Sequence, residues 1–545
     1  MVKLNQLLNK YEKFIPVVLF IIFFLITAPG TSWGLPTRLH PHEVIKVVFK
    51  ALFGDWQFDT KIFVYTSLPK YVMFWMGKII LWLGYSQQAI YLSARLFSVL
   101  LGASIVSITY RLTRLAGGSI YLGLLASFLV ISNSQMAQDS RFAHNDIYLT
   151  FFVCLTAFTL VKYFITGRRT LLYLAFFECG LAVSSKQNGI GLVFATIVLV
   201  LIIEWNILRK DLLRAVETFF IGIVLTVLGF GIGTPKALTW AAFYFKRMAS
   251  TIKMYQTYNI YPGDKIGIFE QWKSIELALG KPVYILCILA FITLFIKVGI
   301  HLFRKTAEKG NHIKSLFVLF MLILAIDLPL LLSYVDRPRY FLPLVPLLSV
   351  LISFFIQELI SFAGDRNIKY ATQAIIAATL LIISFSMLRV VSIGLLFFND
   401  SRMAASKYVK TLPPKSSIEY TIYPPPIDKK IFTNANPYPI HFIKWEWEEE
   451  ELPTIDPALN TGEAGIEERQ PEYLIFDSFT YARFSDDRVC ERHLVECEFY
   501  NRLIDGETNY ELIASFEYDL PGYIPEVKSY FLNPDILIFK RVSAD

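Results

Sequence analysis

The sequence predicts a polytopic α-helical membrane protein that ends in a water-soluble α/β domain. Of its 545 residues, 54% are hydrophobic and 18% are charged, and the mean hydropathy is +0.48. The apolar residues gather in runs that approach the length needed to span a bilayer. From Asp400 to Asp545 the acidic residues outnumber the basic ones by 27 to 15, although the whole chain has a net charge of +7. This division indicates a basic membrane domain followed by an acidic soluble domain, and it argues against a nucleic-acid-binding protein.

Eleven apolar runs are predicted to cross the membrane. They lie at residues 14–31, 90–110, 119–135, 147–165, 171–185, 189–205, 216–234, 281–300, 315–333, 341–361 and 371–397. The first resembles a signal peptide, but no small-residue cleavage site follows closely, so we expect it to be retained. A shorter run at 71–84 contains Lys78, and its length favours a helix that lies along the membrane surface.

The charges of the loops predict the orientation. Every second loop is basic, as cytoplasmic loops are; the residues concerned are Lys3, Lys10, Lys13, Arg111, Arg114, Arg168, Arg169, Arg209, Lys210, Arg214, Arg304, Lys305, Lys309, Lys314, Arg366 and Lys369. We therefore expect a cytoplasmic N-terminus and outer loops at 32–89 and 235–280. The predicted domains are a membrane domain at 1–398 and an extracytoplasmic domain at 399–545, and the expected location is the plasma (inner) membrane.

The tail has the pattern of a folded domain. Its β-rich runs read SSIEYTIYPPP, PEYLIFDSF, YELIASFEYD and PDILIFKRV, and they are separated by proline, aspartate and asparagine. Cys490 and Cys497 could form a disulfide if the tail is extracytoplasmic, but their spacing alone leaves the pairing open.

Polar residues gather in four segments that the charge pattern places at the outer face. They are His40, His42 and Glu43 in GLPTRLHPHEVIK, Arg141, His144 and Asp146 in RFAHND, Lys186 in SSKQNG, and Arg337, Arg339 and Tyr340 in DRPRYF. Ionisable groups beside a bilayer are costly unless they are paired, solvated or functional. A solvated helix end is the alternative for each carboxylate, and an anchor at the headgroups is the alternative for the arginines.

This set of residues suits sugar transfer from a polyprenyl-phosphate carrier. A carboxylate can act as a general base toward an acceptor hydroxyl or amine, and lysine and arginine can hold the phosphate leaving group. Tyr258 and other aromatic residues of the 235–280 loop could stack on a sugar or bind a lipid chain, although an interfacial aromatic belt explains them equally.

The histidines also suit a divalent metal, since His40, His42, His144 and Asp146 supply ligands of the right kind. However, no standard ligand spacing is present, and an extended His40-Pro41-His42 segment points its two imidazoles apart. A metal therefore stays an alternative, and we predict no cofactor.

Taken together, the four segments resemble family 39 glycosyltransferases of the GT-C superfamily, which include the protein O-mannosyltransferases and the aminoarabinose transferases of lipid A. The resemblance covers about residues 14–400 and rests on the acidic first-loop motif, RFAHND, SSKQNG and RPRYFLPLVP. It implies a GT-C fold and an inverting transfer of a monosaccharide from a polyprenyl-phosphate donor at the extracytoplasmic face. The acceptor, whether lipid, glycan or protein, stays open.

The first-loop motif of this family is usually Asp-Glu, whereas this chain has His42 and Glu43. The resemblance makes Glu43 the first choice for the catalytic base. His42 would share the proton transfer or orient Glu43, and Asp146 would carry part of the acidic role. The same resemblance gives Lys186, Arg337, Arg339 and Tyr340 to the donor phosphate.

A transporter or flippase for a lipid-linked or polar solute is the main alternative. Such a protein should place polar groups near the middle of the membrane and show internal repeats. Here the informative charges lie at one face, and the two halves of the chain show no similarity. A scaffold without enzymatic activity would leave Glu43, Asp146, Lys186 and Arg339 with no common purpose.

Overall fold

The computed structural model describes residues 2–545 apart from 38, 42, 55–65, 258–267, 304–310, 332–336, 429, 433–434, 438–462, 492–493, 528, 530 and 543–545. The chain forms two compact units. The first, called the membrane unit, comprises Met1–Ser32, His42–Asn259 and Asp264–Ile393. The second, called the C-terminal unit, comprises Trp33–Pro41, Ile260–Gly263 and Gly394–Asp545. A short piece of the first predicted outer loop thus groups with the end of the chain.

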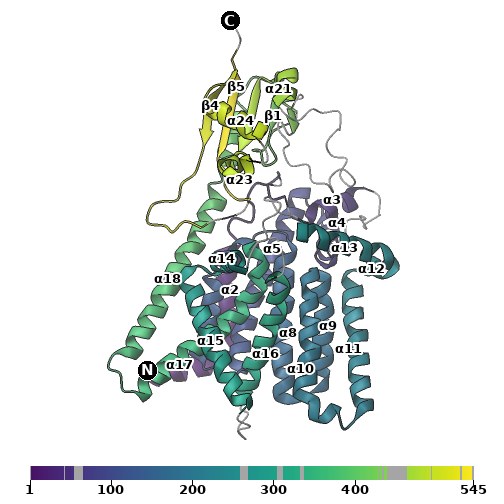
Figure 1. Ribbon diagram of the computed structural model, residues 1–545, viewed down its shortest axis with the longest axis vertical. Helices are drawn as coiled ribbons and strands as arrows, with labels where there is room; N and C mark the ends of the chain where they lie inside the picture. Colours follow the sequence, from purple (N-terminus) through teal and green to yellow (C-terminus); the bar gives the residue numbers. More distant parts are fainter. Residues whose placement is uncertain are drawn as a thin grey trace. The chain divides into compact units, whose positions relative to one another are not determined.

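Helices form at all eleven predicted spans (Figure 1). They are α2 (Ile15–Thr27), α5 (Gln87–Leu115), α6 (Ile120–Ile131), α8 (Asn145–Thr166), α9 (Arg169–Ser185), α10 (Ile190–Leu208), α11 (Leu212–Gly233), α15 (Lys281–Phe303), α16 (Asn311–Leu331), α17 (Val345–Asp365) and α18 (Ala371–Phe398). Within the described residues, seven helical segments are long and apolar enough to cross a membrane, and they include α5, α8, α10, α11, α15, α17 and α18. The chain is therefore a multi-pass membrane protein. Among the other four helices, α2, α6 and α9 have only 13, 12 and 17 residues.

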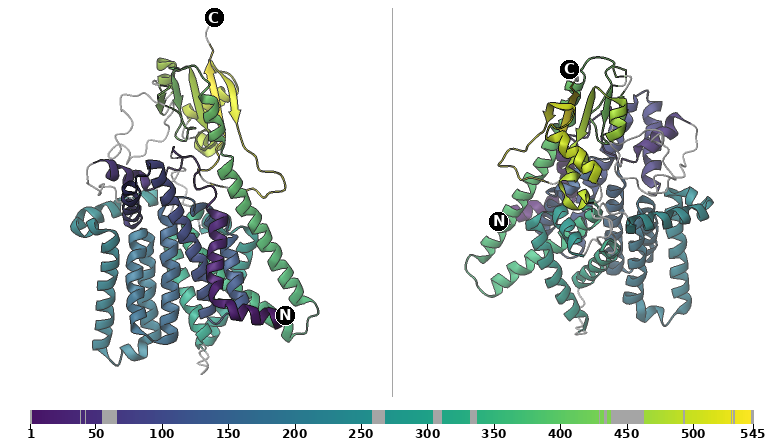
Figure 2. Two further views of the ribbon diagram at one scale, coloured as in Figure 1. Left: turned by 180° about the vertical axis from the view of Figure 1, so that it is seen from behind. Right: turned by 45° about the horizontal axis from the view of Figure 1, so that its top comes forward.

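Shorter helices complete the membrane unit. They are α1 (Val2–Tyr11), α3 (Ile45–Phe53), α4 (Leu68–Trp82), α7 (Ser134–Asp139), α12 (Pro235–Thr239), α13 (Ala241–Thr257) and α14 (Ile268–Leu279). Helices α3, α4, α12 and α13 lie at one end of the long helices, and the purple α1 turns away from α2 (Figures 1 and 2). Helix α4 is the run that was predicted to lie along the surface, and it exposes Trp75, Ile79 and Trp82.

The centre of the membrane unit is α8, which packs on α5, α9, α16 and the 3-10 helix η3 (Pro338–Leu344). Of the 18-residue apolar stretch of α8, 61% is buried, whereas the corresponding share in α11 is 22%. Helix α11 lies at the periphery and exposes apolar side chains such as Phe220 and Ile223. Helices α9 and α11 approach closely, since a Cβ at Gly180 would collide with the carbonyl oxygen of Thr226.

The C-terminal unit contains a five-stranded sheet in the order β2-β1-β3-β5-β4. Its strands are β1 (Ile418–Tyr420), β2 (Ala435–Pro437), β3 (Tyr473–Asp477), β4 (Tyr510–Phe516) and β5 (Ile536–Arg541). Strand β1 pairs in parallel with β2 and β3, whereas β5 is antiparallel to β3 and β4. The four β-rich runs predicted from the sequence contain β1, β3, β4 and β5.

Helices flank this sheet, and two apolar clusters contain residues from its strands. The helices are α19 (Ser401–Val409), α21 (Glu463–Arg469), α22 (Ser478–Tyr481), α23 (Asp487–Cys490) and α24 (Leu494–Ile504). A disulfide joins Cys490 and Cys497, whose Cα atoms are 5.4 Å apart. The pairing left open by the sequence is therefore present, and it links α23 to α24.

Candidate functional site

The candidate site is built around Asp146, in the first turn of α8, which is almost completely buried. Its Oδ1 accepts a hydrogen bond from the Nζ of Lys186. Its Oδ2 lies 2.8 Å from the Nδ1 of His144 and 3.8 Å from the Nε of Arg339. Three basic side chains from different segments of the membrane unit therefore converge on one carboxylate.

Local structure explains how these side chains are placed. Helix α9 ends at Ser185, and Lys186 adopts an extended conformation before the chain turns into α10. Asn145 fixes this junction to the start of α8, because its side-chain amide donates to the carbonyl of Ser185 at 2.6 Å. Arg339 comes from η3, which begins with Pro338 and packs on α8.

Tyr340 completes the cluster. Its ring lies 4.3 Å from the Nζ of Lys186 and 5.6 Å from the guanidinium carbon of Arg339. Both distances suit cation–π contacts, which hold the two cations in place beside Asp146. Arg337 stands at the start of η3, where its carbonyl accepts from the backbone N–H of Tyr340.

Glu43 forms a second buried ion pair in the membrane unit. Its Oε1 accepts from the Nε of Arg95 at 2.8 Å and from the backbone N–H of Ala143 at 3.0 Å, and its Oε2 accepts from the Nη2 of Arg95 at 2.9 Å. Both side chains are completely inaccessible. Arg95 also donates to the carbonyl of Thr31 at 2.8 Å. Glu43 thus fixes the first outer loop to α5 and to the residue that precedes His144.

Arg95 was not among the residues proposed from the sequence. It lies inside the apolar run at 90–110, where a charged residue is costly unless it has a partner. That cost was the available indication that Arg95 has a buried partner, but the sequence could not identify Glu43 as that partner.

Arg141 is buried, and its guanidinium bonds to backbone carbonyls. It donates to Ala137 at 2.7 Å, to Pro29 at 2.9 Å and to Ile26 at 3.1 Å. The last two carbonyls lie at the C-terminal end of α2, where helical carbonyls need partners. These contacts favour a structural role for Arg141 over the substrate contact expected from the sequence.

The remaining predicted residues fall elsewhere. His40 belongs to the C-terminal unit, where its buried ring packs edge to face on Phe531, with the centroids 5.4 Å apart. His42 and Tyr258 lie outside the described residues. Among the residues that the structure does describe, no group of three His, Cys, Asp or Glu side chains could hold a metal ion.

Asp139, at the end of α7, is a third buried carboxylate of the membrane unit. The side chain of Gln135 donates to its Oδ2 at 2.8 Å. Burial, and then repulsion from Asp146, raise the pKa of Asp139 to about 7. Burial also lowers the pKa of His144 despite the neighbouring carboxylate of Asp146, so its imidazole is neutral at pH 7. Asp139 was not among the site residues predicted from the sequence.

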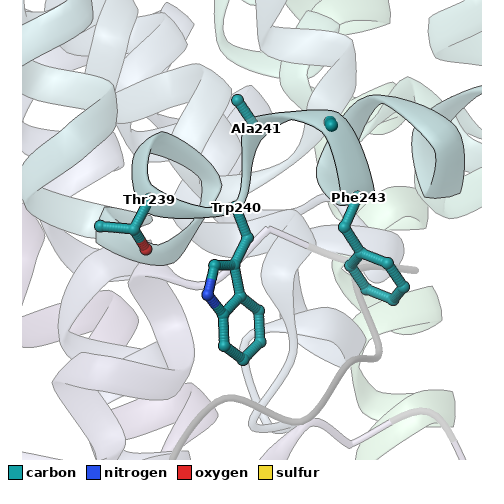
Figure 3. A pocket seen from close by; sticks show the side chains of 5 residues that line it. Thr239, Trp240, Ala241 and Phe243 are labelled. Carbon is teal, nitrogen blue, oxygen red and sulfur yellow. The ribbon is translucent and has the colours of Figure 1, made fainter.

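The loop at 235–280, predicted to lie outside, contributes a separate pocket of about 440 Å³, lined by Thr239, Trp240, Ala241, Ala242 and Phe243. Figure 3 shows the rings of Trp240 and Phe243 projecting to the same side of the junction between α12 and α13. Lys236 lies 4.7 Å from the centre of the Trp240 ring, and Arg247 lies 5.8 Å from that of Phe243. Such alternation of cations and aromatic rings is typical of helices at a membrane surface.

Comparisons of sequence identify a related family over one segment of the chain. Residues 69–249 match the family model described as dolichyl-phosphate-mannose-protein mannosyltransferase. This segment includes Asp146 and Lys186 but ends before Arg339. A comparison with curated proteins finds no match.

Solved structures match over almost the whole chain. The apo oligosaccharyltransferase of Archaeoglobus fulgidus has a TM-score of 0.53 at 13% identity, covering 94% of this chain and 81% of that one. The oligosaccharyltransferase AglB of the same organism, in complex with an inhibitory peptide and a dolichol-phosphate, has a TM-score of 0.51 at 12% identity and covers 90% and 72%. ArnT from Cupriavidus metallidurans bound to undecaprenyl phosphate has a TM-score of 0.47 at 12% identity and covers 96% and 97%. At these identities the likeness concerns the fold, and it rests on the two archaeal structures.

Proposed function

We propose that this chain, which has the fold of the GT-C membrane glycosyltransferases and matches the mannosyltransferase family over residues 69–249, transfers a monosaccharide from a polyprenyl-phosphate donor to an acceptor. The family match confirms the resemblance that the motifs predicted. The observation that carries the proposal is the convergence of Lys186, Arg339 and Tyr340 on Asp146. The dolichol-phosphate in the AglB structure supports a lipid phosphate as the ligand.

The cluster has the charge that an anionic donor requires. Lys186 and Arg339 carry two positive charges, whereas Asp146 supplies one negative charge and His144 is neutral. Asp139, which interacts with the same charges, adds a second negative charge only when the pH rises through its pKa of about 7, so the surplus holds while it is protonated. The surplus cation would attract a phosphodiester in a site with few competing waters. Lys186 and Arg339 would then hold the phosphate as it leaves with two electrons from the broken glycosidic bond. Arg337 and Tyr340 would line the same anion site.

The proton of the acceptor requires a carboxylate. Among the described residues of the membrane unit four carboxylates are buried: Glu43, Asp139, Asp146 and Glu178, of which Glu178 lies inside α9 and accepts from Thr159. Protonating Glu43 would leave the buried guanidinium of Arg95 without its counterion, which is strongly unfavourable. Asp146 is held ionised by Lys186 and Arg339. Asp139 has a pKa of about 7, which suits a base near neutral pH. We therefore assign the role of proton acceptor to Asp139, and we assign to Glu43 the positioning of the first outer loop.

His42 precedes Glu43 directly in the chain. Its role stays a prediction of the resemblance: it shares the proton transfer or orients the carboxylate beside it. In an inverting reaction the acceptor oxygen or nitrogen attacks the anomeric carbon as the bond to the phosphate breaks. The acceptor proton passes to the base, and polyprenyl phosphate is released.

The orientation predicted from loop charge belongs to this proposal. The N-terminus would be cytoplasmic, and the site and the C-terminal unit would be extracytoplasmic in the plasma (inner) membrane. The sugar and the acceptor class, whether lipid, glycan or protein, stay open.

The test is a transfer assay with purified protein in detergent. We expect release of polyprenyl phosphate from polyprenyl-phosphate sugars only when a lipid, glycan or peptide acceptor is added, with no release by Lys186→Met. Movement of the lipid-linked sugar across liposomes without any transfer would support the transporter alternative instead.

A further inference from the structure

Two arginines lie at the end of the membrane unit that is remote from Asp146. Asp146 is in the first turn of α8, whereas Arg169 follows the end of that helix, so roughly 30 Å of helix separates the two residues. Arg169 begins α9, and Arg214 lies in the first turn of α11. Neither arginine therefore belongs to the site proposed for sugar transfer.

The packing of α9 on α11 brings these two arginines together. The Nη1 of Arg169 lies 4.0 Å from the Oε2 of Glu217, and farther along both helices the ring of Phe176 covers Gly222. These contacts advance in the same direction along the two helices, so α9 and α11 are parallel and their first turns lie side by side. Glu217 comes three residues after Arg214, which places it on the same face of α11. The guanidinium groups of Arg169 and Arg214 are therefore neighbours.

Each of the two guanidinium groups has a buried donor that the protein leaves unused. The Nη2 of Arg169 and the Nε of Arg214 are buried, and neither has a hydrogen-bond partner among the residues that the structure describes. Glu204, which is close to both charges, accepts a hydrogen bond from Tyr163 instead. A buried donor without an acceptor costs free energy, and more so when it is charged. The preference for basic residues in cytoplasmic loops explains the charges but not their burial, whereas an acceptor from outside the chain would satisfy both donors.

The surroundings of the two arginines suit an anion with an apolar tail. Residues 162–169 and 204–217 contain six basic side chains and three acidic ones, so this end of the unit is positively charged. A stripe of exposed apolar side chains begins beside Arg214 and continues along α11. Its members are three or four residues apart and therefore share one face of the helix; they are Leu213, Val216, Phe220 and Ile223.

We propose that Arg169 and Arg214 bind the headgroup phosphate of an anionic phospholipid, whose acyl chains lie along the apolar stripe of α11. The planar guanidinium group suits phosphate oxygens, which accept hydrogen bonds from two of its N–H groups at once. Basic pockets between membrane-spanning helices bind anionic headgroups in this way. This lipid site is independent of sugar transfer, so the outcome of the transfer assay does not decide whether it exists.

The experiment titrates the full-length protein, purified and delipidated in detergent, with three probes while its Tm is measured. The probes are phosphatidylglycerol, phosphatidylcholine with the same acyl chains, and inorganic phosphate. We expect phosphatidylglycerol to raise the Tm in a saturable way, with an apparent affinity about tenfold or more above that of phosphatidylcholine. Inorganic phosphate at the same concentrations should have no effect. Equal effects of the two lipids would overturn the headgroup site, and an equal effect of inorganic phosphate would overturn the lipid as its ligand.

Variants then test the two arginines. Arg169→Gln and Arg214→Gln should each weaken the apparent affinity for phosphatidylglycerol by about tenfold and leave that for phosphatidylcholine unchanged. Arg214→Gln also covers the possibility that Arg169→Gln does not fold, because it keeps the backbone N–H that donates to Asp211 at the start of α11. Arg209→Gln is the matched control, since it removes one exposed charge at the same end of the unit. An equal loss of affinity in Arg209→Gln, or no loss in Arg214→Gln, would reduce the effect to general surface charge and overturn the proposal.

Discussion

The membrane unit holds two buried charge arrangements that differ in how completely they are neutralised. Glu43 and Arg95 form a one-to-one pair in which both carboxylate oxygens bind the guanidinium. The arrangement around Asp146 has two cations, Lys186 and Arg339, for one carboxylate. The first is closed and completely inaccessible, whereas the Arg339 side chain of the second is 12% exposed.

This difference in neutralisation indicates a structural role for the first arrangement and a ligand-binding role for the second. A closed pair fixes the elements that carry its partners, but it offers no charge to a ligand. An unbalanced cluster keeps a field that an anion can neutralise, and the low dielectric around it strengthens that field. We therefore read Glu43 and Arg95 as the frame of the site, and Lys186 and Arg339 as its binding groups.

The largest expected effect is on stability, and it tests the structural role of the pair formed by Glu43 and Arg95. Arg95→Met leaves the carboxylate of Glu43 buried without a counterion, so the protein should lose about 3–5 kcal/mol of stability. Thermal unfolding in detergent would show this as a lower Tm and a lower yield of folded protein.

The matched control is the double variant Arg95→Met with Glu43→Leu. Replacing both partners by apolar side chains removes the isolated charge, so much of the stability should return. The same double variant tests Glu43 as the base. Transfer activity that persists in it contradicts Glu43 as the base, whereas a folded but inactive protein shows that Glu43 is needed, either as the base or to position the first loop.

The next prediction concerns the binding groups. Lys186→Met should lower kcat/KM by 10²–10³, roughly, because a charged donor to the leaving phosphate is lost. Stability should also fall, although by less than in Arg95→Met, since Arg339 still lies 3.8 Å from the buried carboxylate of Asp146. Lys297→Met is the matched control, because Lys297 forms a similar pair with Glu358 at 2.6 Å elsewhere in the unit. Equal activity in the two variants would remove Lys186 from the site.

The outline of the fold could be predicted because helix formation in a bilayer depends on local composition. All eleven predicted runs are helical, and the four β-rich runs of the tail form strands β1, β3, β4 and β5. The sequence could not show that Trp33–Pro41 would join the C-terminal unit, since that depends on Asp400 and Arg402 far along the chain.

The site was predictable to the extent that isolated charges are informative. Asp146, Lys186 and Arg339 stood out because each lies beside an apolar run, and the structure brings them together. Arg95 was counted as part of such a run. Asp139 was not predicted, because a raised pKa depends on burial and on neighbours that only the folded chain supplies.

The proton acceptor gives the third prediction. Asp139→Asn should lower kcat by about 10² or more, since general bases contribute this much. In wild type the activity should rise with pH through about 7, as the Asp139 carboxyl ionises, and this limb should be absent in the variant. The stability of the folded state should change with pH in the opposite direction to the activity. The pKa of Asp139 is raised from 3.8 to about 7 by folding, so the stability that this carboxyl contributes is lost as the pH rises through 7. Asp139→Glu should keep part of the activity, and Asp365→Asn, on an exposed helix end, should keep all of it.

The smallest expected effect probes the outer member of the cluster. Arg339 lies 3.8 Å from Asp146, farther than Lys186, and its side chain is partly exposed. Its contribution to a bound phosphate should therefore be weaker, so Arg339→Ala should weaken donor binding by about tenfold. It should also move the Asp139 limb of the pH profile to higher pH, because the charge of Arg339 lowers the pKa of Asp139. Titration of the purified variant with a polyprenyl-phosphate sugar measures this, and Arg339→Lys should recover part of the affinity because it restores the charge without the planar fork. An unchanged affinity in Arg339→Ala would mean that Lys186 alone neutralises the phosphate. Arg339 would then have only a structural role, like the pair of Glu43 and Arg95.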